Sequence, residues 1–383
     1  MAMTTRIAIV EVAQSAGNDT TDNLYDLIYK VTKEALDKAG LTIDEVETVI
    51  SSATDIFTGI SCANAFYWDS TAAFLKNGSR QDGESLFALG YAAMRIMGGH
   101  YDTALAIGIC KGSEVPEYDS LTSLFGDPFC QRPLGLNETN AAALQMRLYM
   151  DRYGITQEQC AQVSVKNLGN ALGNPYAHRK RQYSVEDVLK SERTVDPLTR
   201  LQCAPQSDGV VAVVLVSEEK ARQLTKQPVW LKGYGSSLDG FHLGDRDLLN
   251  GSLHEAAKRA YRMAGITDPQ KEIDLAEISE PYAFQELLWC EQMGLCGEGE
   301  GGRLIDSGRT QIDGDLPVNA SGGVLANNPY VSRGLQRVAE AVLQLRGQGG
   351  ERQVKKDVST ALAHGTTGLA GQCHAVAILS VEE

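Results

Sequence analysis

The 383-residue chain lacks the features that mark membrane, secreted and nucleic-acid-binding proteins. No apolar segment approaches the ~20 residues that a bilayer-spanning helix needs. The opening residues, MAMTTRIAIVEVAQ, contain no basic stretch followed by a long apolar run, so no signal peptide is expected. Lys and Arg total 35 against 49 Asp and Glu, and the resulting net charge of −14 disfavours binding to nucleic acid.

Cysteines are few and scattered. The eight thiols include no Cys-x-x-Cys pair, which argues against structural zinc and against a disulfide framework. We therefore expect a cytoplasmic protein that holds no metal. A Walker loop, a dinucleotide-binding glycine fingerprint and a Gly-x-Ser-x-Gly elbow are also absent from the sequence, so the protein classes that they mark are not indicated.

Helices and strands alternate along the chain, which predicts an α/β architecture with parallel pairing. The expected strands are Arg6–Val12, Val46–Ser51, Ala104–Gly108 and the apolar run ending at Val216, and the expected helices are Leu24–Gly40 and Glu84–Met97. Residues 112–192 interrupt this order with prolines and with helices near Asn140–Tyr153 and Thr156–Ala171. They predict a helical and loop cap inserted into the first α/β unit.

Two segments of the first half return in the second half. KEALDKAGLTIDEVETVI at Lys33–Ile50 resembles KRAYRMAGITDPQKEIDLAEI at Lys258–Ile278, and Ser85–Gly108 resembles Leu335–Gly365 in its order of helix, glycine and strand. The shared order of several elements predicts a duplicated fold. We place the boundary near Glu218–Pro228, with an N-terminal half at residues 1–225 and a C-terminal half at residues 226–383.

The stretch Leu316–Arg346 predicts a strand, a glycine-rich turn and a helix that begins near Val331. Ser321, Gly322 and Gly323 let the backbone of the turn pass close to another group. Amides at such a turn suit a polar ligand or a developing oxyanion, and a tight turn without a ligand explains the same pattern.

Five stretches together resemble the thiolase superfamily, in the branch related to sterol-carrier-protein-2-type thiolases. They are LPVNASGGVL, MDRYGITQEQCAQVSVKNLGNALGNPYA, SDGVVAVVLVSEE, AEISEPYAFQEL and ALAHGTTGLAGQCHAVAIL. The resemblance implies a thiolase fold, with two βαβαβαββ halves stacked in αβαβα layers, and a homodimer. It also implies a coenzyme A thioester as substrate, carbon–carbon bond chemistry, and a small partner subunit with a zinc ribbon and an OB-fold.

The catalytic motifs of that family are only partly present. A nucleophilic cysteine should precede the helix of the first repeat, but the motif places Asp82 at its position, and Asn328 stands at the histidine of the family's Gly-His-Pro loop. Ser279, followed by Glu280, replaces the Asn or His of a third motif. His364 alone matches its catalytic counterpart.

Three functions are consistent with these departures. The first is an enzyme that makes or breaks a carbon–carbon bond through an enolate, as in a retro-aldol reaction, without a cysteinyl acyl-enzyme. The second is a thiolase-type acyltransferase whose nucleophile is displaced to Cys110, Cys373 or Cys62, or in which coenzyme A attacks the β-ketone directly. The third is a catalytically silent subunit that binds coenzyme A as a scaffold.

The candidate catalytic side chains lie in or beside the matched motifs; they are His364, Asp82, Asn328, Tyr282, Glu280 and Tyr330. The candidate substrate and coenzyme A contacts are Ser321, Gly322, Gly323, Ser279, Arg179 and Gly365. Several have a structural alternative. Asp82 could cap the helix that follows it, Tyr282 could pack as a core residue, and Arg179 belongs to a short basic cluster that suits a phosphate or a solvated turn.

Overall fold

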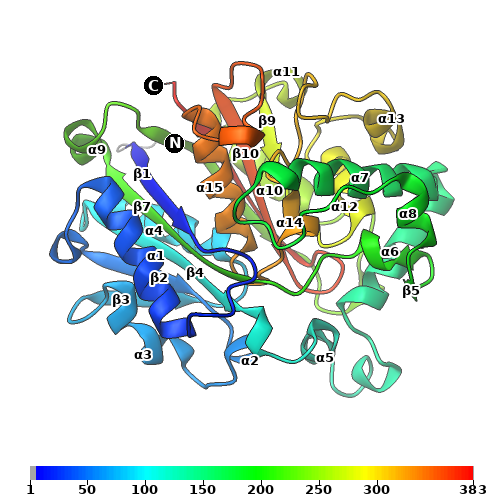
Figure 1. Cartoon of the computed structure of the whole chain (residues 1–383), viewed down its shortest axis with the longest axis horizontal. Helices are drawn as coiled ribbons and strands as arrows, with labels where there is room; N and C mark the ends of the chain where they lie inside the picture. Colours follow the sequence, from blue (N-terminus) through cyan, green and yellow to red (C-terminus); the bar gives the residue numbers. More distant parts are fainter. Residues whose placement is uncertain (1–5, 383) are drawn as a thin grey trace.

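A mixed sheet of nine strands forms the centre of the computed structural model, which describes residues 6–382 apart from the side chains of Ala63 and Asn64 (Figure 1). The strand order is β3-β2-β4-β7-β1-β8-β11-β10-β9. In chain order these strands are β1 (Ile7–Gln14), β2 (Thr48–Ser52), β3 (Asn77–Gln81), β4 (Thr103–Lys111), β7 (Asp208–Ser217), β8 (Val229–Leu238), β9 (Leu275–Glu277), β10 (Thr360–Thr367) and β11 (Cys373–Ser380).

The sheet consists of two mirrored parts that meet at β1 and β8. Only two residue pairs join these strands, Ala8 with Trp230 and Ile9 with Val229. Outward from this seam, β7, β4 and β2 on one side correspond to β11, β10 and β9 on the other. The predicted duplication of the fold is confirmed. Helix α1 (Leu24–Ala39) and β2 recur as α10 (Leu253–Ala264) and β9, and α4 (Ser85–Met97) and β4 recur as α15 (Arg333–Leu345) and β10. The boundary at residues 225 and 226 stays a prediction.

Helices cover both outer faces of the sheet and also fill the space between its two parts. The helices of these three layers are α1 (Leu24–Ala39), α4 (Ser85–Met97), α10 (Leu253–Ala264), α12 (Ala283–Gln292) and α15 (Arg333–Leu345). Helices α4 and α15 pack against strands of both parts and share one apolar core with them, whereas α1 covers the first part and α10 covers the second. This order of layers confirms the predicted αβαβα architecture.

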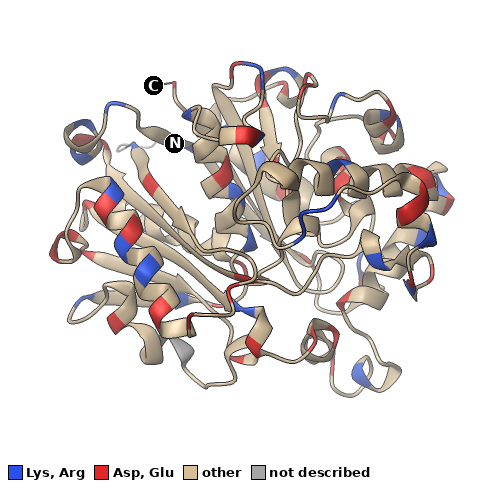
Figure 2. Ribbon diagram, in the orientation of Figure 1, with Lys and Arg blue, Asp and Glu red and all other residues tan. Residues whose placement is uncertain are grey.

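The element boundaries follow from local chemistry. Helix α1 begins where the Asn23 side chain accepts a hydrogen bond from the Asp26 amide, and it ends at Gly40 in the left-handed conformation. Strand β7, DGVVAVVLVS, is buried along its whole length because strands lie on both sides of it and helices cover both faces. Acidic and basic residues are interspersed along α1 (Figure 2).

The cap is longer than predicted. It runs from Gly112 to Ser207, because the small hairpin of β5 (Arg193–Val195) and β6 (Leu198–Thr199) belongs to it as well. The two predicted cap helices are confirmed as α6 (Glu138–Tyr153) and α7 (Gln157–Asn170). The cap also contains the shorter helices α5 (Tyr118–Thr122) and α8 (Val185–Lys190).

The strand predicted at the start of Leu316–Arg346 is wrong. Val318 makes a single parallel bridge to Ala276, and the turn contains the short helix α14 (Gly323–Ala326). This bridged segment lies beside β9, at the place that β3 occupies beside β2. The remaining short helices are α2 (Asp55–Thr58), α3 (Ala63–Tyr67), α9 (Glu218–Leu224), α11 (Pro269–Glu272) and α13 (Gly301–Asp306). Within residues 6–382, none of the helices has the length and apolar character that crossing a bilayer requires.

Candidate active site

A polar cavity of about 240 Å³ lies between the cap and the second half of the chain. Three of the predicted site residues line it: Arg179, Tyr282 and Asn328. Eight further polar residues of the wall were not predicted, namely Glu117, Tyr118, Asp119, Glu138, Thr139, Thr194, Arg200 and Gln206. Two larger cavities of about 570 Å³ each have mainly apolar walls. A third, of about 360 Å³, has a polar wall around Asp274 but includes none of the predicted site residues, so we take the smaller cavity as the candidate site.

A chain of hydrogen bonds links three of these side chains. The Thr139 hydroxyl donates to Asp119 Oδ1 at 2.6 Å, and Thr139 Oγ1 lies 2.8 Å from Tyr282 Oη. Because the Thr139 proton is engaged by Asp119, the Tyr282 hydroxyl is the donor in the second bond. Burial raises the pKa of Tyr282 well above its ordinary value, which keeps the phenol neutral. The arrangement can therefore pass a proton from the cavity to the half-buried Asp119 carboxylate.

The backbone of Asn328 is fixed by hydrogen bonds, and the residue lines the cavity. Its amide donates to Ser207 Oγ at 3.1 Å, and its carbonyl accepts from the Ser207 amide and from the Tyr118 hydroxyl, both at 3.2 Å. Its side-chain oxygen is buried and has no hydrogen-bond partner within the described chain. This oxygen is free to accept a hydrogen bond from a ligand, while the predicted donation by the Asn328 side chain to a thioester oxygen stays a prediction.

Arg179 lies at the wall of the same cavity. Its Nη1 donates to the Cys203 carbonyl at 2.7 Å, which anchors one side of the guanidinium. Burial lowers its pKa, although the group remains a cation at neutral pH. A fixed cation beside a polar cavity suits a phosphate group.

The carboxylate that caps α4 belongs to Glu84 and not to the predicted Asp82. Asp82 is exposed and accepts a hydrogen bond from the amide of the next residue, Gly83. Glu84 Oε1 is fully buried and accepts from the Leu86 amide at 3.0 Å and from the Gly334 amide at 2.9 Å. One carboxylate therefore joins the N-termini of both central helices, α4 and α15. Burial raises its pKa to about 7.

Arg333 lies between Glu84 and Glu138, a residue of the cavity wall. It is fully buried, its Nε donates to the Thr366 carbonyl at 2.9 Å, and its guanidinium lies 4.5 Å from the centre of the Tyr330 ring. Two carboxylates face it at ionic distance: Glu84 at 3.7 Å and Glu138 at 3.6 Å. Glu138 lines the cavity, so this ion pair forms part of the cavity's inner wall.

His364 does not line the cavity, and both of its ring nitrogens take part in hydrogen bonds. Its Nδ1 accepts from the Ser279 amide at 3.3 Å, and its Nε2 lies 2.9 Å from Nδ1 of His374. Burial, His374 and Arg333 lower the pKa of His364 well below its ordinary value, so the imidazole is neutral. The ring packs edge-on against Trp289. The predicted proton transfer by His364 is untested, but this geometry leaves no ring nitrogen open to a substrate.

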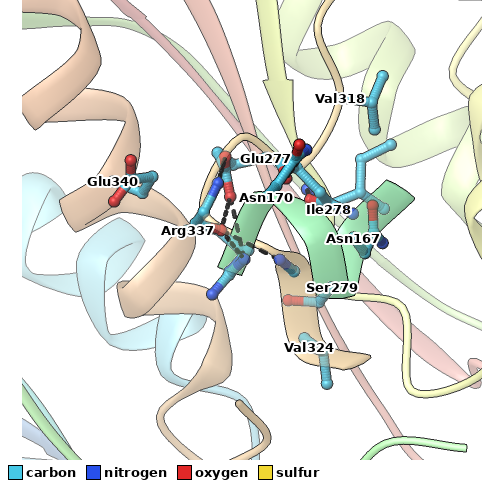
Figure 3. A network of polar contacts seen from close by, with 12 residues as sticks. Asn167, Asn170, Glu277, Ile278, Ser279, Val318, Val324, Arg337 and Glu340 are labelled. Atoms are coloured by element: carbon cyan, nitrogen blue, oxygen red, sulfur yellow. Dashed lines mark hydrogen bonds and ion pairs between the residues drawn. The ribbon is translucent and has the colours of Figure 1, made fainter. Parts of the chain in front are cut away.

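The predicted ligand-binding turn is occupied by the protein's own carboxylates (Figure 3). The Ser321 amide and hydroxyl donate to Glu277 at 3.1 and 2.6 Å, and Arg337 donates to Glu277 at 2.9 Å. Burial raises the pKa of Glu277 to about 7. The turn therefore holds a buried ion pair, and its amides do not face the cavity.

Glu280 also points toward the buried turn at Ser321–Gly323 and not into the cavity, which corrects the prediction. It accepts from the Val324 and Leu325 amides at 3.2 Å and from Asn167 at 2.9 Å, and burial raises its pKa to about 8. A Cβ at Gly323 would lie 2.0 Å from its carboxylate oxygen, and Gly323 has a φ of +66°. Glycine is required at this position to admit the Glu280 carboxylate.

The other predicted contacts are also buried among side chains outside the cavity. Gly322, with a φ of +96°, passes the Ala171 side chain, and Gly365 passes the Glu84 carboxylate so closely that a Cβ would lie 2.8 Å from the carboxyl carbon. Tyr330 is buried in a ring stack with Phe57, whose centre is 4.5 Å away. None of these residues, nor Ser279 and Ser321, is among the residues that line the polar cavity.

The three predicted substitute cysteines lie elsewhere. Burial raises the pKa values of Cys110 and Cys373 to about 11, which disfavours the thiolate, and Cys62 is exposed. Cys203, which was not predicted, is the cysteine that lines the cavity in the part of the chain that the structure describes. Its pKa is raised to about 12 by burial, so it is a thiol as well.

The residues that sequence reasoning missed are Asp119, Glu138, Thr139, Cys203 and Arg333. Four of them belong to the cap, whose sequence matches none of the family's catalytic motifs. Arg333 could have been noticed, because a cation in the first turn of a helix opposes the helix dipole. Such a residue usually has a specific partner, which here is the pair Glu84 and Glu138.

Comparison with known proteins gives one consistent set of matches. A family profile described as "Thiolase C-terminal domain-like" covers residues 235–381. The acetyl-CoA acetyltransferase of Methanothermobacter thermautotrophicus is 36% identical over 271 residues, which is 70% of each chain. Sterol carrier protein 2 of Oryctolagus cuniculus is 34% identical over 241 residues, which is 58% of this chain but only 42% of that longer protein.

Solved structures match over almost the whole chain. The structure named "Ltp2-ChsH2(DUF35) aldolase" superposes with a TM-score of 0.84 and 25% identity, over 98% of this chain and 97% of that chain. Human mitochondrial 3-ketoacyl-CoA thiolase superposes over the full length of both chains with a TM-score of 0.75. At 16% identity, this second likeness concerns the fold alone.

Proposed function

This chain belongs to the thiolase superfamily, and on that premise we propose that it makes or breaks a carbon–carbon bond beside a coenzyme A thioester without a cysteinyl acyl-enzyme. In the cleavage direction the substrate is a 3-hydroxyacyl-CoA, and the products are a shorter acyl-CoA and an aldehyde or ketone. Coenzyme A takes part as the thioester, and the proposal requires no metal.

The observation that carries the proposal is the chain of hydrogen bonds from Tyr282 through Thr139 to Asp119 in a cavity without a favoured thiolate. The acyl transfer typical of the family uses a cysteine thiolate at the N-terminus of α4, where Glu84 lies instead. A retro-aldol reaction needs only a base for the 3-hydroxyl group and a means to stabilise an enolate.

The proposed steps follow from this arrangement. The substrate hydroxyl gives its proton to Tyr282 as Tyr282 gives its own to Thr139 and Thr139 gives its own to Asp119. The new carbonyl forms as the bond between Cα and Cβ breaks, and the electron pair passes to the thioester as an enolate. The Asn328 carboxamide donates to the enolate oxygen, and Arg179 binds a phosphate of coenzyme A.

We extend the proposal to the assembly and setting of the protein. The matched aldolase carries a DUF35 partner in its name, which supports a similar small zinc-ribbon and OB-fold subunit here. A homodimer, a division at residues 225 and 226, and a cytoplasmic location are further parts of the proposal. Size-exclusion chromatography with light scattering would test the homodimer directly.

A second function is favoured by one observation, the position of Cys203 at the cavity wall. If a partner or substrate promotes its ionisation, Cys203 would accept an acyl group, as in a thiolase.

A silent subunit that only binds coenzyme A is the third possibility. It predicts binding of acyl-CoA with neither cleavage nor acylation.

One experiment separates the three functions. Purified protein is incubated with short, branched and aromatic 3-hydroxyacyl-CoAs and, separately, with the matching 3-oxoacyl-CoAs, and mass spectrometry follows the shorter acyl-CoA, the carbonyl product and any acylated peptide. We expect cleavage without acylation, and a loss of about 100-fold or more in Tyr282→Phe. Tyr149→Phe is the matched control, because it removes the hydroxyl of another buried tyrosine, bonded to Glu291 outside the cavity. Acylation of a cysteine, or full activity of Tyr282→Phe, would contradict the proposal.

A further inference from the structure

The inner wall of the cavity contains an acidic group that the proposed proton chain does not use. Glu138 is the first residue of α6; it is 6% exposed and lines the cavity. Its backbone is fixed, because its amide donates to Thr122 Oγ1 at 3.1 Å. Its carboxyl group lies in the same cavity as Asp119, so the site has two carboxyl groups in different surroundings.

The two carboxyl groups differ in what holds them. Asp119 is half-buried and accepts a hydrogen bond from the Thr139 hydroxyl. Glu138 is buried, and its cationic neighbour is Arg333 at 3.6 Å, just beyond hydrogen-bond distance. Burial raises the pKa of Glu138, Arg333 opposes that rise, and Asp119 adds to it. Such a pair divides into a base and an acid.

Arg333 has unpaired hydrogen-bond donors that a Glu138 carboxylate can use. It is fully buried, and its Nη1 and Nη2 groups have no hydrogen-bond partner among the described residues. Buried guanidinium nitrogens without partners are rare, since each lost hydrogen bond is destabilising. A carboxylate formed at Glu138 supplies the missing acceptor with a small movement of either side chain.

We propose that Glu138 is the group that protonates the α-carbon of the thioester enolate, and that Arg333 positions it and stabilises the carboxylate that results. This inference rests on the proposed function. The electron pair of the enolate takes the proton from the Glu138 carboxyl group, which gives the acyl-CoA product and a carboxylate beside Arg333. Asp119, protonated in the cleavage step, then releases its proton to solvent, and Glu138 takes one up.

By microscopic reversibility, the same carboxylate removes an α-proton from a simple acyl-CoA. This reaction involves no 3-hydroxyl group, so it depends on Glu138 and not on the Tyr282 chain. Exchange of the α-hydrogen with deuterium from D₂O, in propionyl-CoA and phenylacetyl-CoA, therefore reports on the Glu138 step separately from the Tyr282 chain.

The test compares three variants by mass spectrometry of the α-carbon. Glu138→Gln should slow exchange by about 100-fold or more while still binding the acyl-CoA, and Tyr282→Phe should exchange normally but fail to cleave a 3-hydroxyacyl-CoA. Glu340→Gln is the matched control, because Glu340 is also buried beside an arginine, Arg352, outside the cavity. Wild-type exchange in Glu138→Gln overturns the inference and leaves the proposed function standing. If the wild-type protein exchanges the α-hydrogen of neither propionyl-CoA nor phenylacetyl-CoA, both the inference and the proposed function are refuted.

A pH profile tests the positioning role of Arg333. Exchange should rise with pH as Glu138 ionises, in surroundings that include Arg333, Asp119, Tyr282 and Tyr330, with Glu84 on the far side of Arg333. Removing the cation in Arg333→Met should move this rise to higher pH, and Arg333→Lys should restore part of the shift.

The control for this profile lies on the same helix. Arg337→Met also removes a buried arginine from a carboxylate, Glu277, but outside the cavity (Figure 3). It should leave the profile in place. If both variants move the profile equally, the shift reflects general damage to the core and the role of Arg333 is refuted.

Discussion

Replacing Glu84 by glutamine should change how the stability of the protein depends on pH. The Glu84 carboxyl group is fully buried, and burial raises its pKa from 4.5 to about 7 although Arg333 is near. The unfolded chain ionises this group at lower pH than the folded chain does, so wild-type stability falls as pH rises from 4.5 towards 7. With these values the loss between about pH 5.5 and about pH 8 is about 2 kcal/mol. Glutamine keeps an acceptor oxygen for the Leu86 and Gly334 amides and has no proton to lose.

Urea unfolding of both proteins at the two pH values provides the measurement. The difference in the free energy of unfolding, variant minus wild type, should be about 2 kcal/mol higher at the higher pH than at the lower pH. The raised pKa values of Glu277 and Glu280 cancel in this difference, because both proteins retain them. Glu186→Gln, an exposed change on α8, should give the same difference from wild type at both pH values. An equal difference for Glu84→Gln at both pH values would refute the reasoning.

Three further outcomes are expected. Gly323→Ala should lower the free energy of unfolding by about 3 kcal/mol or more, because its methyl group meets the Glu280 carboxylate, whereas Gly154→Ala, with a similar φ but open space, should cost about 1 kcal/mol in the same thermal or urea assay. Asp119→Asn should abolish cleavage of a 3-hydroxyacyl-CoA and preserve α-deuterium exchange, and loss of both would place Asp119 in the exchange step. Cys203→Ser should cleave at nearly the wild-type rate; an inactive but folded variant would favour the acyl-enzyme.

The layers of the fold were predictable because their signals are local and were present twice. The apolar run of β7 and the glycine after α1 each determine an element without help from distant residues. The repeated order of α1 with β2 and α10 with β9 then predicts the duplication. The hairpin of β5 and β6 was missed, because strands of two or three residues are too short to show a period.

The site was less predictable, since it depends on contacts between distant segments. Tyr282 and Asn328 were found from motifs, but Asp119 and Thr139 come from two cap helices whose spacing in the sequence says nothing of their contact. His364 matches its motif, yet its surroundings include His374, ten residues on and brought to it by the antiparallel pairing of β10 with β11.

The carboxylate that Glu84 shares between two helices has a consequence for the order of synthesis. Its acceptor bond to Gly334 spans 250 residues of chain, so the ribosome finishes α4 long before it makes α15. At about 5–20 residues per second, the wait is on the order of 10–50 s. During that time the inner face of the first half, together with a carboxyl group destined for burial, lies open to water and to chaperones, and limited proteolysis of ribosome-bound chains would register it. The apolar core that α4 shares with α15 therefore cannot form until the second half of the chain has been synthesised.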